Sequence, residues 1–145
     1  MAAREMKVKE ESREKAGDYL KKASDNYEQM LAAFHAANWN AAATLAVQCA
    51  ISLADAICVY EKGMRSVSQD HLDVCDLVAG LSLDGAKEKS KQLRKIMARK
   101  NLVQYECRSV HKADADEMVK VTARVYQWVR EAVGGSFQKG PSALK

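Results

Sequence analysis

The stretch from Asn40 to Lys62 decides the fold and reads NAAATLAVQCAISLADAICVYEK. Apolar and small side chains occupy nearly every side of a helix drawn over this stretch, and such a helix belongs at the centre of a bundle or at an oligomer interface. Gly63 follows directly, in the position where helices commonly end. We therefore predict a central helix over 40–62 around which the rest of the chain packs.

The segments on either side of this helix also have helical periodicity. Apolar residues recur at three and four positions over 12–37 and again after Ser109, which is suited to capping a last helix. A further long helix is predicted over 84–106, and a short one after Ser68 or Asp70, since either residue can cap it. The sequence thus predicts an all-α fold, an up-and-down antiparallel bundle of four long helices plus one short helix.

The composition agrees with one helical domain. The chain has 145 residues with one proline and seven glycines, which is typical of long helices. Asn38 to Asn40 is a break, where asparagine suits a left-handed helix end and the cap of the next helix. We expect a bundle over 12–133, flanked by a charged flexible N-terminus over 1–11 and a flexible tail over 134–145.

The sequence lacks signals for metal, cofactor or membrane. Its cysteines are expected to be reduced core thiols, because no CxxC pair and no histidine at finger-like spacing accompanies them; they are Cys49, Cys58, Cys75 and Cys107. The charged start to Arg13 excludes a secretory h-region, and no apolar run approaches the length of a membrane span. We expect a cytoplasmic protein with no membrane partner, no metal and no cofactor.

A basic ridge is the clearest electrostatic feature. Four basic residues stand at successive four-residue steps and three more join them, with Glu88 as the one acid among them; the set is Lys87, Lys91, Lys95 and Arg99 with Lys89, Arg94 and Lys100. The net charge of the chain is +4. Two interpretations stay open. The ridge is either a solvated helix face or a surface that contacts phosphate, which supplies the salt-sensitive part of nucleic-acid affinity.

Just after this ridge the chain reads RKNLVQYE over 99–106, which resembles the late helical motif of HEPN domains. The resemblance extends to 19–63, where an alanine-rich first helix leads through Trp39 into ATLAVQCAI over 43–51, and to the closing helix with Trp128. It implies a helical domain that often dimerises and often belongs to toxin–antitoxin or antiphage systems. Active members cut RNA without a metal.

In active members the resemblance implies an arginine followed by a histidine, with four to six residues between them. From Arg99 those positions hold Gln104, Tyr105 and Glu106, so the histidine, whose pKa near neutrality suits it to acid–base work, is missing. Arg65 and His71 match the spacing at an earlier place in the chain. They are either a catalytic pair or surface residues of a loop and a helix start.

A polar face on the central helix is formed by Thr44, Gln48, Ser52 and Asp55, which recur at steps of four, four and three. These residues form an internal hydrogen-bonded seam, or they line a cleft opposite Lys100 and Asn101, where the resemblance places Asp55. The catalytic candidates are Arg99, Tyr105 and Asp55. The candidates for binding RNA or phosphate are Lys87, Lys91, Arg94, Lys95, Arg99, Lys100 and Asn101.

Three functions follow from these patterns. The first is a degenerate HEPN-like module, expected to be a homodimer, that binds RNA, a nucleotide or a protein partner such as an antitoxin. The second is a metal-independent endoribonuclease toxin. The third is a dimeric scaffold whose ridge only maintains solubility.

Overall fold

The computed structural model describes residues 7–100, 103 and 109–134. Its helices are a short 3₁₀ helix at Arg13–Lys15, then α1 at Ala16–His35, α2 at Trp39–Lys62, α3 at Leu72–Ala79, α4 at Ala86–Met97 and α6 at Lys112–Val129, which continues into a π-helical turn at Arg130–Gly134. Two three-residue strands, β1 at Val8–Glu10 and β2 at Met64–Ser66, complete the described elements. The prediction of a helical bundle is confirmed.

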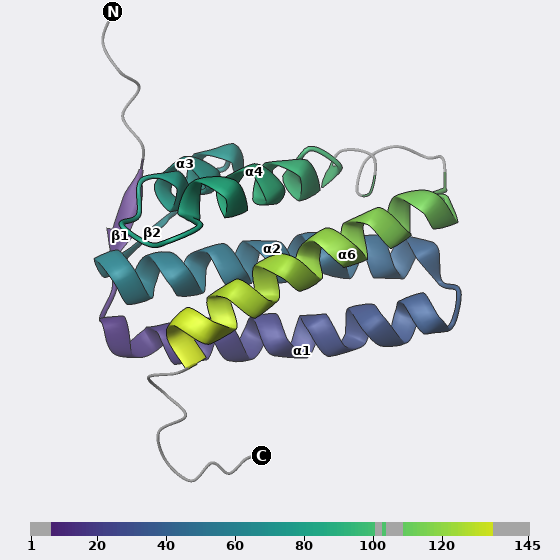
Figure 1. Ribbon diagram of the computed structural model, residues 1–145, viewed down its shortest axis with the longest axis horizontal. Coiled ribbons are helices and arrows are strands. Elements are labelled where there is room, and N and C mark those ends of the chain that lie inside the picture. The colour runs from purple at the N-terminus through teal and green to yellow at the C-terminus, as the bar shows by residue number, and fades with distance from the viewer. Residues whose placement is uncertain (1–6, 101–102, 104–108, 135–145) are drawn as a thin grey trace, which may run out of the picture.

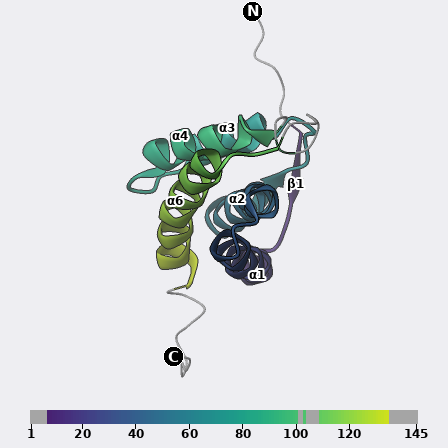
Figure 2. The ribbon, with the colours of Figure 1, turned by 90° about the vertical axis from the view of Figure 1, so that its right-hand side faces the viewer.

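Helix α2 lies at the centre of the arrangement. Figure 1 shows α1 and α2 running antiparallel, with α6 crossing them and α3 and α4 stacked above. Seen from the end, α2 is enclosed by α1, α6 and the α3–α4 layer, with β1 on the remaining side (Figure 2). More than half of the residues of α2 are buried, so its apolar sequence meets protein on most sides.

Small side chains let the neighbouring helices approach α2 closely. Six alanines of α2 are buried, namely Ala42, Ala43, Ala46, Ala50, Ala54 and Ala56. Larger side chains, such as Leu53 and Ile57 of α2 and Val125 of α6, fill the core between the helices. Tyr27 of α1 and Tyr126 of α6 stack with ring centroids 4.0 Å apart. The core is therefore continuous across α1, α2 and α6.

Helix α2 is capped at both ends by residues that the sequence predicts, but the left-handed residue before it is a different one. The Asn38 side chain accepts a hydrogen bond from the Ala41 amide at 3.3 Å and so caps the helix. At the other end Gly63 has a left-handed φ of 65°. The left-handed residue before α2 is Ala37, with φ of 60°, and not an asparagine. Asn38 is used for the cap instead.

The two strands are absent from the sequence prediction. β1 pairs antiparallel with β2, with Lys9 opposite Arg65, and the Glu11 amide donates to the Gly63 carbonyl at 2.8 Å. Val8–Glu10, within the segment predicted to be a flexible N-terminus, therefore form a strand, and Glu11 continues the contact with Gly63. Three-residue strands are too short to produce a detectable alternating pattern.

Two helix boundaries also differ from the prediction. Helix α4 ends at Met97 and residues 98 and 99 form a turn, so the predicted continuous helix over 84–106 is wrong. The last helix begins after His111, whose amide donates to the Asp114 carboxylate at 3.4 Å, and Ser109 does not cap it. The short helix is as predicted, since the Asp70 carboxylate accepts from the Leu72 amide at 3.0 Å.

The sequence-based expectation that no apolar run is as long as a membrane span is wrong. By length and composition alone α2 could cross a bilayer. However, 72% of its most apolar window is buried inside the protein, as in the core helix of a bundle. The described cysteines, Cys49, Cys58 and Cys75, are free and buried, which confirms them as core thiols, and burial raises the pKa of Cys49 to about 12.

We predict that Leu53→Ala destabilises the protein by about 2–5 kcal/mol, because the Leu53 side chain is fully buried in α2 and its loss leaves a cavity. Leu72→Ala is the matched control, since Leu72 is 40% exposed and the same atoms are removed. Urea unfolding followed by circular dichroism measures both. Equal losses for the two variants would contradict the placement of α2 at the centre of the core.

Candidate functional site

Helix α4 separates its apolar and basic residues onto different faces. Its buried residues follow helical spacing and are Ala86, Ser90, Leu93, Ile96 and Met97. Ser90 joins α4 to α3 by donating a hydrogen bond to the Cys75 carbonyl at 2.8 Å. Lys87 and Lys91 are exposed and form no ion pair with a residue that the structure describes. Their ammonium groups are therefore available to a ligand.

The other basic residues of the ridge have acidic neighbours. Arg94 pairs with Asp76 of α3. The Lys95 ammonium lies 4.0 Å from the Glu117 carboxylate, and the Lys95 side chain is 67% exposed. Ion pairs as exposed as these are weak and are screened by salt. Lys87 and Lys91 are thus the exposed basic residues of the ridge that have no ion pair with a described residue.

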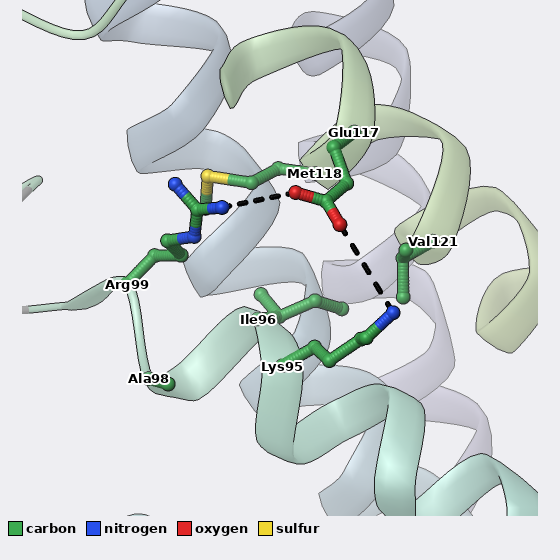
Figure 3. A pocket seen from close by; sticks show the side chains of 7 residues that line it. All are labelled: Lys95, Ile96, Ala98, Arg99, Glu117, Met118 and Val121. Carbon is green, nitrogen blue, oxygen red and sulfur yellow. Dashed lines mark hydrogen bonds and ion pairs between the residues drawn. The ribbon is translucent and has the colours of Figure 1, made fainter. Parts of the chain in front are cut away.

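Arg99 lies in the turn after α4 and is directed toward α6. Its guanidinium donates to Asp114 at 2.7 Å and to Glu117 at 2.9 Å. Figure 3 shows Arg99 and Lys95 reaching the same Glu117 carboxylate from two sides, above Ile96. The cavity between these side chains has a volume of about 210 Å³. The hydrogen bond from Arg99 holds the pKa of Asp114 below its usual value.

A second cavity, of about 450 Å³, lies between α1 and α2. Most of its lining side chains are polar or charged, and they are Tyr19, Lys22, Asp25, Asn26, Gln48, Ile51, Ser52, Asp55 and Arg65. Asp55 is only 8% exposed, and burial raises the pKa of its carboxyl to about 6. An acid that titrates near neutrality can donate or accept a proton at physiological pH.

Arg65 links this acid to the N-terminal strand. Its guanidinium lies 4.0 Å from Asp55 and donates to the Glu11 carboxylate at 2.8 Å. Tyr19 donates to the same carboxylate at 2.6 Å, and these two hydrogen bonds lower the pKa of Glu11 to about 2. The Tyr19 pKa rises to about 12, through burial and then through this bond. Glu11 therefore remains ionised and holds Arg65 beside Asp55.

A third cavity, of about 310 Å³, continues from Asp55 and Arg65 to the start of α3. His71 is among its lining residues. The structure thus brings Arg65, His71 and Asp55 to one cavity, although Arg65 belongs to β2 and not to the predicted loop. Burial, followed by the charge of Lys100, lowers the pKa of His71. The neutral form of His71 is therefore favoured.

The predicted polar face of α2 does not act as one unit. Gln48, Ser52 and Asp55 line the cavity between α1 and α2. Thr44 instead donates to the carbonyl of Asn40 in its own helix at 3.0 Å. Among the described residues there is no group of three or more His, Cys, Asp or Glu side chains that could hold a metal ion.

Comparison with known proteins gives a match to the family model described as the HEPN domain, over residues 16–132. The chain belongs to the HEPN family. No curated protein and no solved structure matches the chain. HEPN domains are in general RNA-related or nuclease-like modules, and the match runs from the start of α1 into the π-helical turn after α6. Strand β1 precedes the matched residues.

Only part of the segment 99–106, which resembles the late HEPN motif, lies among the described residues. Asn101 and Tyr105, predicted for RNA binding and catalysis, lie outside them. Arg99 and Asp55, the other catalytic candidates, line separate cavities. Glu11, whose pairing with Arg65 spans 54 positions, was not among the residues predicted for a site. No local signal could have identified that pair, because both residues read as ordinary surface charges.

We predict that Asp55→Asn stabilises this HEPN domain at pH 8, by at most about 3 kcal/mol for a pKa raised from 3.8 to about 6. The Asp55 carboxyl binds its proton more tightly in the folded than in the unfolded protein. The stability of the natural protein therefore falls as pH rises from 4 to 6, and the full loss is reached above pH 6. Arg65 keeps its partner Glu11 in the variant. The difference should vanish below pH 4.

Urea unfolding at pH 8 and at pH 4 measures this effect, with Asp25→Asn as the control. Asp25 is an exposed acid paired with Lys21, so its replacement should change stability by no more than about 1 kcal/mol at either pH. If Asp55→Asn were less stable than the natural protein at pH 8, the attraction between Asp55 and Arg65 would outweigh the cost of burial.

Proposed function

We propose that this HEPN domain binds RNA through the lysines of α4 and does not cut it at Arg99. The observation that carries the proposal is the difference between these basic groups. Lys87 and Lys91 are exposed and unpaired among the described residues, whereas Arg99 already has two carboxylate partners. Ammonium groups along one helix face suit the regularly spaced phosphates of a nucleic acid.

The two hydrogen bonds from Arg99 to acids of α6 favour binding of RNA over its cleavage. An arginine that stabilises charge on a reacting phosphate must direct its donors at that phosphate. Here one terminal nitrogen donates to Asp114 and the other to Glu117. The motif also has no histidine at the spacing that active members require. Both departures favour a module that holds RNA and does not hydrolyse it.

We predict that Lys87→Glu together with Lys91→Glu lowers RNA affinity at least tenfold, because two phosphate contacts become repulsive. Affinity of the natural protein should also fall as salt rises. The measurement uses a labelled cellular RNA pool, with a chelator present, on parallel native and denaturing gels. Retention of intact RNA by the natural protein is the expected result.

The control is Lys15→Glu together with Lys21→Glu, which makes the same change in net charge beside and along α1, at side chains that are 60% and 73% exposed. Its affinity should stay close to that of the natural protein. Equal losses in both double variants would mean that only net charge matters, which contradicts a site on α4. If RNA is neither retained nor cut, a protein partner becomes the better explanation.

A second function, metal-independent RNA cleavage, is favoured by one specific observation. Arg65, His71 and Asp55 line the same cavity, and the pKa of Asp55 is about 6. In such cleavage a base removes the proton of the 2′-hydroxyl, whose oxygen attacks phosphorus, and an acid protonates the departing 5′-oxygen. Arg65 would stabilise the charge on the phosphate, with Asp55 and His71 as the acid–base pair.

If this second function holds, the denaturing gel shows discrete cleavage in the presence of chelator. His71→Gln and Asp55→Asn should each then lower the cleavage rate by about 100-fold or more, as loss of a general acid or base does. Lys87→Glu with Lys91→Glu should weaken binding of the same RNA instead. Intact RNA after prolonged incubation with the natural protein would exclude the cavity as a nuclease site.

A further inference from the structure

We propose that Trp39 and Phe34, at the end of the bundle where α1 passes into α2, stack a base of single-stranded RNA. This inference rests on the proposed RNA binding and adds the class of RNA and the residues that contact a base. Trp39 and Phe34 are both half-buried, and their rings meet edge to face with centroids 5.2 Å apart. Aromatic faces of this kind bind unpaired bases of any sequence.

A basic side chain lies over this aromatic pair. The ammonium of Lys112, the first residue of α6, is 5.8 Å from the centroid of the Trp39 ring. Lys112 is exposed and has no ion pair with the residues described. His35 is also exposed, and its ring meets that of Phe34 at 6.1 Å. A base on the Trp39 ring would therefore place its own phosphate near Lys112.

A series of ion pairs and hydrogen bonds connects this end of the bundle with α4. Lys95 and Arg99 share Glu117 of α6, and Arg99 also binds Asp114, which lies two residues after Lys112. The start of α6 and the α1–α2 connection lie at the same end of the bundle (Figure 1). The Val110 amide donates to the Asn40 side chain across them at 2.8 Å. One RNA strand can thus follow α4 and reach Trp39.

The two tryptophans differ in their hydrogen bonding, which assigns a packing role to Trp128 and a binding role to Trp39. Trp128 donates its indole N–H to the Asp84 carbonyl at 2.9 Å, and a methyl group on Gly85 would lie 3.3 Å from the same nitrogen. The Trp39 indole N–H has no hydrogen-bond acceptor among the described residues. Its ring meets Phe34 edge to face, and the flexible side chain of Lys112 lies over it. Trp39 is thus the tryptophan that is free to contact a ligand.

The test uses the fluorescence of Trp39. The chain has two tryptophans, so Trp128→Phe leaves Trp39 as the single tryptophan, whose emission is excited selectively over that of the tyrosines. This variant is titrated with a short single-stranded RNA and with an abasic oligonucleotide of the same length and charge. We expect the RNA to quench Trp39 and to bind roughly tenfold tighter than the abasic strand. The indole N–H resonances of the natural protein give the same information without a substitution, since only that of Trp39 should shift.

A second variant separates stacking from folding. Trp39→Leu should lose roughly tenfold in affinity for the RNA and keep its affinity for the abasic strand, which also shows that it is folded. If RNA binds without quenching, and the abasic strand binds equally well, the stacking site is refuted while RNA binding on α4 stands. If neither strand binds the natural protein, the proposed function itself fails, and the stacking site fails with it.

Discussion

Helix α2 has to be covered on nearly all sides, and most of the structure follows from that requirement. An exposed helix with this sequence would leave a large apolar surface in water, at a cost of about 25 cal/mol for each Å². Helices α1 and α6 and the α3–α4 layer each cover part of it, and β1 and β2 lie at its C-terminal end. The buried alanines of α2 let its neighbours approach closely, so most of the helix is tightly covered.

The polar cavity is lined by the one acid that α2 buries. A buried carboxylate loses its hydration, and this loss raises the pKa of Asp55 to about 6. Arg65 offsets part of that cost from 4.0 Å, and Glu11 keeps Arg65 in place. The side chain of Glu11 is itself only 5% exposed. A stable fold has no need of an acid in this place, so its presence in the central helix is a reason to look for function in the cavity.

The sequence predicts the parts of this fold that depend on local patterns. Helical periodicity, Gly63 and the cap at Asn38 each involve residues within a few positions of one another, and the structure confirms them. The strands and the pairing of Glu11 with Arg65 depend on contacts between distant parts of the chain. Lysines and arginines at four-residue spacing indicated a continuous ridge, but α4 ends at Met97. Periodicity in one sequence cannot show which acids of α6 will face Arg99.

The position of Arg99 also bears on how a HEPN domain can change its use of RNA. In this chain two acids of α6 take up both terminal nitrogens of the arginine, and the motif lacks its histidine. Through these two hydrogen bonds Arg99 holds the end of α4 against α6. The C-terminal end of α4, with Lys95, thus lies beside the first turns of α6, the helix whose Lys112 lies over Trp39. Under the proposed function, the absence of cleavage at Arg99 and the arrangement of the binding surface would have the same structural cause.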